Sequence, residues 1–185
     1  MIGRPIDDLE MGDTAELSRT ISAANIEQFV TAVGDHNPIH SDAVFAAATS
    51  FGRPIAPGIL TAGLVSAVIG TKLPGPGCLY ISQDLRFLKP VFVGDTITAR
   101  VEIIEIVAER NRIRLKTVCL NERGEEVLTG EAWIKPPKER VVYAGDATSE
   151  CEALGHPWTW GAVAVSMYSR MAVFTLSAWR SSLTT

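Results

Sequence analysis

The chain has 185 residues, of which 46% are apolar and 21% are charged. These proportions are typical of globular proteins and exclude both a disordered chain and a fibrous repeat. The length favours one domain with an appendage over two full domains. The 17 Lys and Arg residues and the 21 Asp and Glu residues give a formal net charge of -4. Because no run of basic residues could follow a phosphate backbone, nucleic acid is not an expected partner.

The three cysteines, Cys78, Cys119 and Cys151, are odd in number and widely spaced. They form no C-x-x-C pair that would indicate a zinc site or a redox dithiol. The first residues also lack the basic and apolar segments of a signal peptide. We therefore expect reduced thiols, a mature N-terminus and a cytoplasmic location.

Two weakly charged stretches raise the question of a membrane span. No residue between Arg53 and Lys72 is charged, but the prolines, glycines and hydroxyl residues of this stretch favour a helix enclosed by protein over a spanning one. In the stretch 161–179, Arg170 lies at the centre, where a charge costs about 2.5–3.5 kcal/mol on insertion scales. We expect a surface-docked or poorly ordered segment there, and no membrane partner.

The first half of the chain predicts a strand and three helices. A strand is expected over 14–21, followed by an amphipathic helix that begins after Ser22 and carries apolar residues at Ile26, Phe29, Val30 and Val33, which is helical spacing. Gly34 and Pro38 end that helix. A short helix is expected over 42–50, and an uncharged helix, apolar on nearly every side, over 58–73.

The second half predicts strand after strand, at 78–88, 95–107, 111–121 and 126–135, separated by turn residues. Pro136-Pro137 closes this unit. The simplest assembly is an α+β domain over residues 1–137, in which an antiparallel sheet wraps around a central buried helix. Residues 138–185 form a tail for which the pattern predicts neither a fold nor a part in chemistry.

The densest group of reactive side chains lies in residues 34–42, which contain two imidazoles and two carboxylates. One interpretation is structural, since Asp and Asn side chains stop helices and stabilise turns. A second is a metal site, since His36 and His40 are four residues apart, but Pro38 prevents the continuous helix that would align them. A third is general acid/base catalysis, in which Asp35 and His40 hold one water between a carboxylate and a neutral imidazole. That arrangement suits hydration chemistry.

A possible site for a carbonyl oxygen follows at Pro57-Gly58. The first N–H groups of a helix lack internal partners and sit at the positive end of its dipole, so Gly58 could donate to an oxygen that gains charge. The structural alternative is that these residues only begin a core helix. Ser66 lies about 12 Å further along that helix, and without a G-x-S-x-G context it is not a hydrolase nucleophile.

Several motifs in this order closely resemble the MaoC-like (R)-specific enoyl-CoA hydratases, which have the hot-dog fold. The resemblance covers about residues 10–137. The residues that carry it are Gly34-Asp35-x-Asn37-Pro38-Ile39-His40-x-Asp42, Arg53-Pro54-Ile55, Gly58-Ile59-Leu60, Leu73-Pro74-Gly75-x-Gly77-x-x-Tyr80, Phe87, Pro90-Val91 and Gly94-Asp95.

The resemblance implies a site and an activity. Asp35 and His40 would activate the water that adds to C3 of a trans-2-enoyl-CoA, the Gly58 N–H would bind the thioester oxygen, and Asn37 and Ser66 would line the substrate pocket. The product would be an (R)-3-hydroxyacyl-CoA, the enzyme a homodimer, and no metal or other cofactor would be needed, because coenzyme A is part of the substrate. Polyhydroxyalkanoate supply and fatty acid metabolism both use this reaction. The chain departs from the family at Pro57, where a His is common.

Two other functions stay open at this point. A hot-dog thioesterase would direct the same water at the thioester carbonyl and release free coenzyme A. A non-catalytic acyl-CoA-binding module would need the pocket but neither Asp35 nor His40. The presence of both residues argues against the binding module.

Overall fold

The computed structural model describes residues 1–144, which form one compact unit, Met1–Ala144. The stretch 161–179 and His156, for which the sequence predicts no catalytic role, lie outside the described residues. The strands are β1 (Ile2–Gly3), β2 (Thr14–Thr20), β3 (Leu79–Phe87), β4 (Thr96–Val107), β5 (Arg112–Leu120), β6 (Glu126–Lys135) and β7 (Val141–Val142). The α-helices are α1 (Ala23–Val33), α2 (Ala43–Ala47) and α3 (Gly58–Thr71), and short 3-10 helices cover Ile6–Asp8, Pro38–His40 and Ala108–Arg110.

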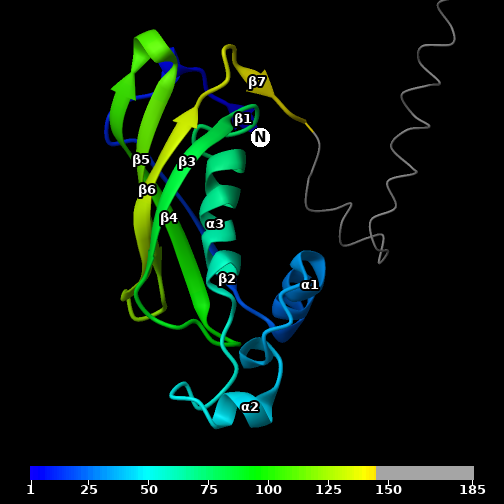
Figure 1. The fold of residues 1–185 in the computed structure, drawn as a ribbon. Coiled ribbons are helices and arrows are strands. Elements are labelled where there is room, and N and C mark those ends of the chain that lie inside the picture. The colour runs from blue at the N-terminus through cyan, green and yellow to red at the C-terminus, as the bar shows by residue number, and fades with distance from the viewer. Residues whose placement is uncertain (145–185) are drawn as a thin grey trace, which may run out of the picture. The chain divides into compact units, whose positions relative to one another are not determined.

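The main sheet has five strands in the order β2-β4-β5-β6-β3, and each neighbouring pair is antiparallel. Its strands alternate between a buried and a solvent-facing side, as in β5, where Ile113, Leu115, Thr117 and Cys119 are fully buried. This alternation is the period-2 pattern of a half-buried strand. Figure 1 shows α3 running along one face of this sheet, so the core lies between the helix and the inward side chains. The expected α+β architecture is confirmed.

Helix α3 is buried on one side and exposed on the other. Leu64, Val65, Val68 and Ile69 face the sheet and are buried, while Ile59, Gly63, Ser66 and Gly70 are exposed. The sequence predicted a helix enclosed on nearly every side. Within one chain the sheet curves around only half of the helix, which leaves a weakly polar stripe uncovered.

The helices before α3 lie near the end at which α3 begins (Figure 1). Ser22 caps α1 and forms a capping box with Asn25, and Gly34 ends the helix in the left-handed conformation with φ of 74°. A helix commonly ends in this way because glycine adopts that conformation without strain. Residues 35–42, which contain two Asp and two His side chains, therefore follow directly after the end of α1. Within residues 1–144, no helix has the length and apolar character needed to cross a membrane.

The compact unit continues past Pro137, where the sequence pattern predicted no further strand. Ile2 pairs with Val142 and Gly3 with Val141, so that β1 and β7 form a second, two-stranded sheet. Outside this pairing, Arg140 makes an ion pair of 2.7 Å with Asp8. Strands of two residues carry no detectable periodicity, which is why the pattern did not predict them.

Because of the β1–β7 pairing, we expect the stable fold to require residues 138–144 but not the residues after Ala144. A chain ending after Ala144 should unfold at the same urea concentration as the full chain and keep its activity. A chain ending after Pro137 loses the β1–β7 hydrogen bonds, and its free energy of unfolding should fall by about 1–3 kcal/mol, at roughly 1 kcal/mol per bond. Urea titration of the three chains measures both effects. Aggregation of the longer truncated chain, or a sharp loss of its turnover, would show that residues 145–185 contribute to fold or function.

Candidate active site

The loop after α1 is stiffened by side chains that bond its backbone. Asp35 Oδ1 accepts a hydrogen bond of 3.3 Å from the Asn37 backbone N–H, and Asn37 Oδ1 accepts one of 3.3 Å from the Ile39 N–H. Asp42 Oδ1 accepts from the N–H groups of Val44 and Phe45 and so caps α2. These are the local bonds by which Asx side chains hold turns and helix starts. Asp42 is therefore engaged in structure, while Asp35 and His40 are held at a fixed separation.

His40 and Asp35 face each other, with His40 Nε2 3.7 Å from Asp35 Oδ2. His40 Nδ1 lies 2.8 Å from the Ile55 carbonyl oxygen, and a carbonyl can only accept, so Nδ1 carries the proton. In a neutral imidazole, Nε2 then presents its lone pair toward Asp35. The His40 side chain is 10% exposed and that of Asp35 41%. Both atoms then act as acceptors, so they make no direct hydrogen bond, and their separation allows one water to donate to both.

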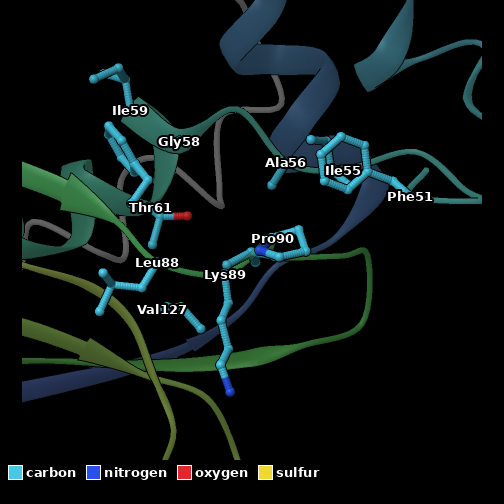
Figure 2. Close-up of a pocket in the computed structure, with 12 residues that line it drawn as sticks. Phe51, Ile55, Ala56, Gly58, Ile59, Thr61, Leu88, Lys89, Pro90 and Val127 are labelled. Atoms are coloured by element: carbon cyan, nitrogen blue, oxygen red, sulfur yellow. The ribbon is translucent and has the colours of Figure 1, made fainter. Parts of the chain in front are cut away.

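An apolar cavity of about 450 Å³ lies beside this pair. Figure 2 shows its lining residues, which come from the loop before α3, the first turn of α3, the end of β3 and the segment after it, and β6. They are Phe51, Ile55, Ala56, Gly58, Ile59, Thr61, Phe87, Leu88, Lys89, Pro90, Val91 and Val127. Asp35 and His40 are not among them. Ile55 connects the two parts of the site, because its carbonyl holds His40 and the residue itself lines the cavity.

Gly58 brings the start of α3 into the cavity wall. It is the first residue of the helix, after Pro57, which makes no side-chain cap, so its N–H has no intrahelical acceptor. A side chain at this position would place its Cβ 2.8 Å from the ring of Phe87. Glycine therefore permits both the close packing of Phe87 and the approach of a ligand oxygen to the backbone.

The other predicted site residues lie elsewhere. Asn37 supports the loop, as described above. Ser66 lies on the exposed side of α3 and does not line the cavity of the single chain, so its place in a substrate pocket stays a prediction. His36 is exposed, and among the described residues no hydrogen bond or ion pair joins its side chain to His40. No group of three or more potential metal-binding side chains occurs within residues 1–144.

One cation lines the cavity, and a second lies between two lining residues, Phe51 and Ile55, in the chain. Lys89 lines it and makes an ion pair of 2.6 Å with Glu125, and hydrogen bonds from Asn121, Lys89 and Arg123 lower the pKa of Glu125 to about 2. Arg53 stacks over the Phe92 ring at 4.0 Å. Both are suitably charged to meet an anionic ligand group, whereas Lys72 bonds the Glu16 carbonyl elsewhere.

Some lining residues were missed by the sequence reading. Thr61 lies one helical turn after Gly58, and that spacing alone would have placed it on the same side of α3. No local pattern places Val127 or Leu88 at the cavity. Val127 lies in β6 and Leu88 follows β3, and the pairing of these two strands brings both residues to the cavity. Sheet register of this kind is not visible in a single sequence.

The chain is similar in sequence to known proteins. The MaoC-like domain matches residues 8–124. The 3-hydroxybutyryl-CoA dehydratase of Methylorubrum extorquens is 50% identical over 133 residues, covering 72% of this chain and 84% of the relative. The (R)-specific enoyl-CoA hydratase of Aeromonas caviae is 43% identical over 129 residues, covering 70% and 96%.

Solved structures show the same fold. The (R)-hydratase of Aeromonas caviae involved in PHA biosynthesis gives a TM-score of 0.68 at 43% identity, with 70% of this chain and 98% of that chain covered. The unliganded R-hydratase PhaJ1 of Pseudomonas aeruginosa gives 0.75 at 37% identity, with 86% and 98% covered. The sheet packed on α3 is thus the hot-dog fold that the sequence resemblance implied, and the chain belongs to the MaoC-like domain family.

Proposed function

We propose that this chain is an (R)-specific enoyl-CoA hydratase, a hydro-lyase that reversibly adds water across the C2=C3 bond of a trans-2-enoyl-CoA. The observation that carries the proposal is the pair of acceptors, Asp35 Oδ2 and His40 Nε2, 3.7 Å apart beside an apolar cavity. Relatives named (R)-specific enoyl-CoA hydratase and 3-hydroxybutyryl-CoA dehydratase, at 41% and 50% identity, support it.

The proposed reaction uses one water held by Asp35 and His40. As the water oxygen bonds C3, the pair withdraws one of its protons, and the C2=C3 electrons shift toward the thioester oxygen. The Gly58 N–H stabilises the charge that develops there. The pair then returns a proton to C2 and regains its starting protonation state. Every step is accounted for by side-chain and backbone groups, so the proposal includes no metal and no redox cofactor.

Incubation with crotonyl-CoA tests this function. We choose a four-carbon substrate because the relative from Methylorubrum extorquens is named for 3-hydroxybutyryl-CoA. Hydration removes the conjugated enoyl absorbance without releasing thiol, and chiral separation should give the (R) product. Release of free coenzyme A would instead identify the thioesterase, and tight binding of crotonyl-CoA without turnover would identify a binding module. Either result rejects the hydratase.

The proposed assembly is a homodimer formed through the β3 edge of the sheet. β2 and β3 are the two edge strands. The exposed residues of β2 are polar, whereas β3 exposes apolar side chains at Leu79, Tyr80, Ile81 and Phe87. An edge strand with exposed apolar side chains is a site for pairing with another strand. The β3 edge is therefore the better candidate for contact with a second copy.

We expect Ile81→Lys to weaken this dimer, because each copy would bring a charge into the contact. The dissociation constant should rise about tenfold or more, which corresponds to roughly 1.4 kcal/mol. Thr14→Lys, on the exposed β2 edge, is the matched control and should leave it unchanged. Light scattering across a dilution series measures both. A monomeric wild-type chain, or equal effects of the two variants, would contradict this assembly.

We also place the protein in the cytoplasm. Cys78 and Cys119 are both free thiols, which suits a reducing compartment. Arg53 and Lys89 are the candidates for contact with the phosphates of coenzyme A, because Lys89 lines the cavity and Arg53 stacks on Phe92, which follows the lining residue Val91.

A further inference from the structure

Thr61 carries a buried hydroxyl without a partner in the wall of the cavity. The residue is 2% exposed. Among the described residues, its Oγ1 is one of two buried side-chain polar atoms that make no hydrogen bond, and the other is Arg114 Nε. The Arg114 guanidinium is otherwise paired with Glu105 and Glu131, so Thr61 is the one whose polar group is wholly unsatisfied.

Other threonines of the fold show that this is not the usual state. On the same helix, Thr71 Oγ1 donates to the Ala67 carbonyl at 2.6 Å, which is how a helical threonine commonly satisfies itself. Thr117, fully buried in β5, is bonded by Gln83 Nε2 at 3.1 Å. Thr61 makes no such bond to Pro57, four residues earlier. A buried hydroxyl without a partner disfavours folding, so a partner from outside the chain is expected.

The hydroxyl is directed toward the place where Gly58 meets the cavity. Helical side chains lean toward the helix N-terminus and cover the preceding turn, and Thr61 is one turn after Gly58. Figure 2 shows Thr61 next to Gly58, with its oxygen directed into the space between α3 and the segment that carries Pro90. The remaining lining residues are apolar except for Lys89, which Glu125 engages. The Gly58 N–H, which lacks an intrahelical acceptor, and the Thr61 hydroxyl are therefore two unengaged donors that this wall offers to a ligand oxygen.

We propose that Thr61 donates a second hydrogen bond to the thioester carbonyl oxygen, beside the one from Gly58. This inference rests on the proposed hydratase function. When the water oxygen bonds C3, the C2=C3 electron pair moves toward that carbonyl oxygen, and the negative charge there is larger in the transition state than in the bound substrate. A donor aimed at this oxygen therefore raises kcat more than it lowers KM.

Thr61→Val tests the assignment, because it replaces the hydroxyl by a methyl group of similar shape. The expected result is a fall in kcat on crotonyl-CoA of about 10²-fold, the lower end for loss of one such donor, with little change in KM. The urea midpoint should stay the same or rise, since the unsatisfied polar atom is removed. Thr61→Ser should restore most of the lost rate. Thr71→Val, on the same helix but at its far end, should retain wild-type turnover.

A pair of inhibitors identifies the atom that the hydroxyl bonds. Butyryl-CoA keeps the carbonyl oxygen, and S-butyl-CoA, a thioether, lacks it. The wild-type chain should bind the thioester more tightly, and Thr61→Val should lose a measurable part of this preference, smaller than its fall in kcat because the carbonyl oxygen carries less charge in a bound thioester than in the transition state. An unchanged preference in Thr61→Val would mean that the hydroxyl bonds something other than the carbonyl, and the assignment would be wrong.

The remaining outcomes are equally decisive. Wild-type turnover by Thr61→Val overturns the inference, and so does an equal loss in Thr61→Val and Thr61→Ser, which would indicate shape and not hydrogen bonding. The wild-type chain is assayed first. If it does not hydrate crotonyl-CoA, the proposed function fails; if it does and the Thr61 variants behave alike, only the role of Thr61 fails.

Discussion

Replacing Asp35 by Asn, or His40 by Gln, should lower the rate of hydration by about 10²- to 10⁴-fold, the range for loss of a general acid/base group. In the proposed reaction the two side chains, 3.7 Å apart, hold the same water, so removing either one disrupts the arrangement that both create. The double variant should therefore lose little more than either single variant, because residues that act as a unit are strongly non-additive. Initial rates on crotonyl-CoA measure all three.

The same loop offers a matched control. His36→Gln changes an exposed imidazole four residues from His40, in a position that makes no contact with the cavity. We expect it to retain wild-type turnover and the same urea midpoint. If His36→Gln is as slow as His40→Gln, or if either pair variant keeps more than about a tenth of the wild-type rate, the assignment of the pair is wrong.

Gly130→Ala should produce the largest loss of stability. A Cβ at Gly130 would lie 1.8 Å from the Asp84 carbonyl oxygen and 3.2 Å from Gln83 Nε2. The first is a backbone atom of the neighbouring strand, so β3 itself must move. Overpacking at sites of this kind costs about 1–3 kcal/mol or more, and we expect the upper end, because Gln83 would also lose its geometry toward Thr117.

The loss should reach the active site, since β3 ends at Phe87 beside Gly58. The urea midpoint and the crotonyl-CoA turnover of Gly130→Ala should therefore both be lower than those of the wild-type chain. Gly70→Ala is the control: no atom lies within 4 Å of the added carbon, and alanine in a helix is favoured over glycine by about 1 kcal/mol. A Gly130→Ala variant as stable as wild type would mean that β3 and β6 do not approach this closely in solution.

The secondary structure was predictable because each element carries its own local signal. The Ser22 cap, the apolar spacing from Ile26 to Val33 and the Gly34 terminus all lie in the same stretch that they specify. The alternation along β5 likewise marks its buried side without knowledge of its neighbours. The pairing of Asp35 with His40 was predictable for the same reason, because two residues five positions apart in a stiff turn cannot lie far from each other.

What could not be predicted depends on residues distant in sequence. The approach of Gly130 to Asp84 follows from the register of two strands. The hydrogen bond from His40 to the Ile55 carbonyl, which sets the tautomer, joins residues 15 apart across α2 and the loop that follows it. The exposed position of Ser66 arises because the sheet covers only half of α3. None of these contacts leaves a local pattern.

The β1–β7 pairing also makes the fold nearly continuous at its ends. The amino group of Met1 donates to the Tyr143 carbonyl at 2.7 Å, and the Tyr143 N–H donates to the Met1 carbonyl at 2.9 Å. In a chain shortened to end after Tyr143, Met1 and Tyr143 would be neighbouring termini, an arrangement that tolerates circular permutation. A few residues joining Tyr143 to Met1 in that shortened chain, with new ends opened in the Ala108–Arg110 turn between β4 and β5, would preserve every strand of the main sheet and leave the Asp35–His40 loop unbroken.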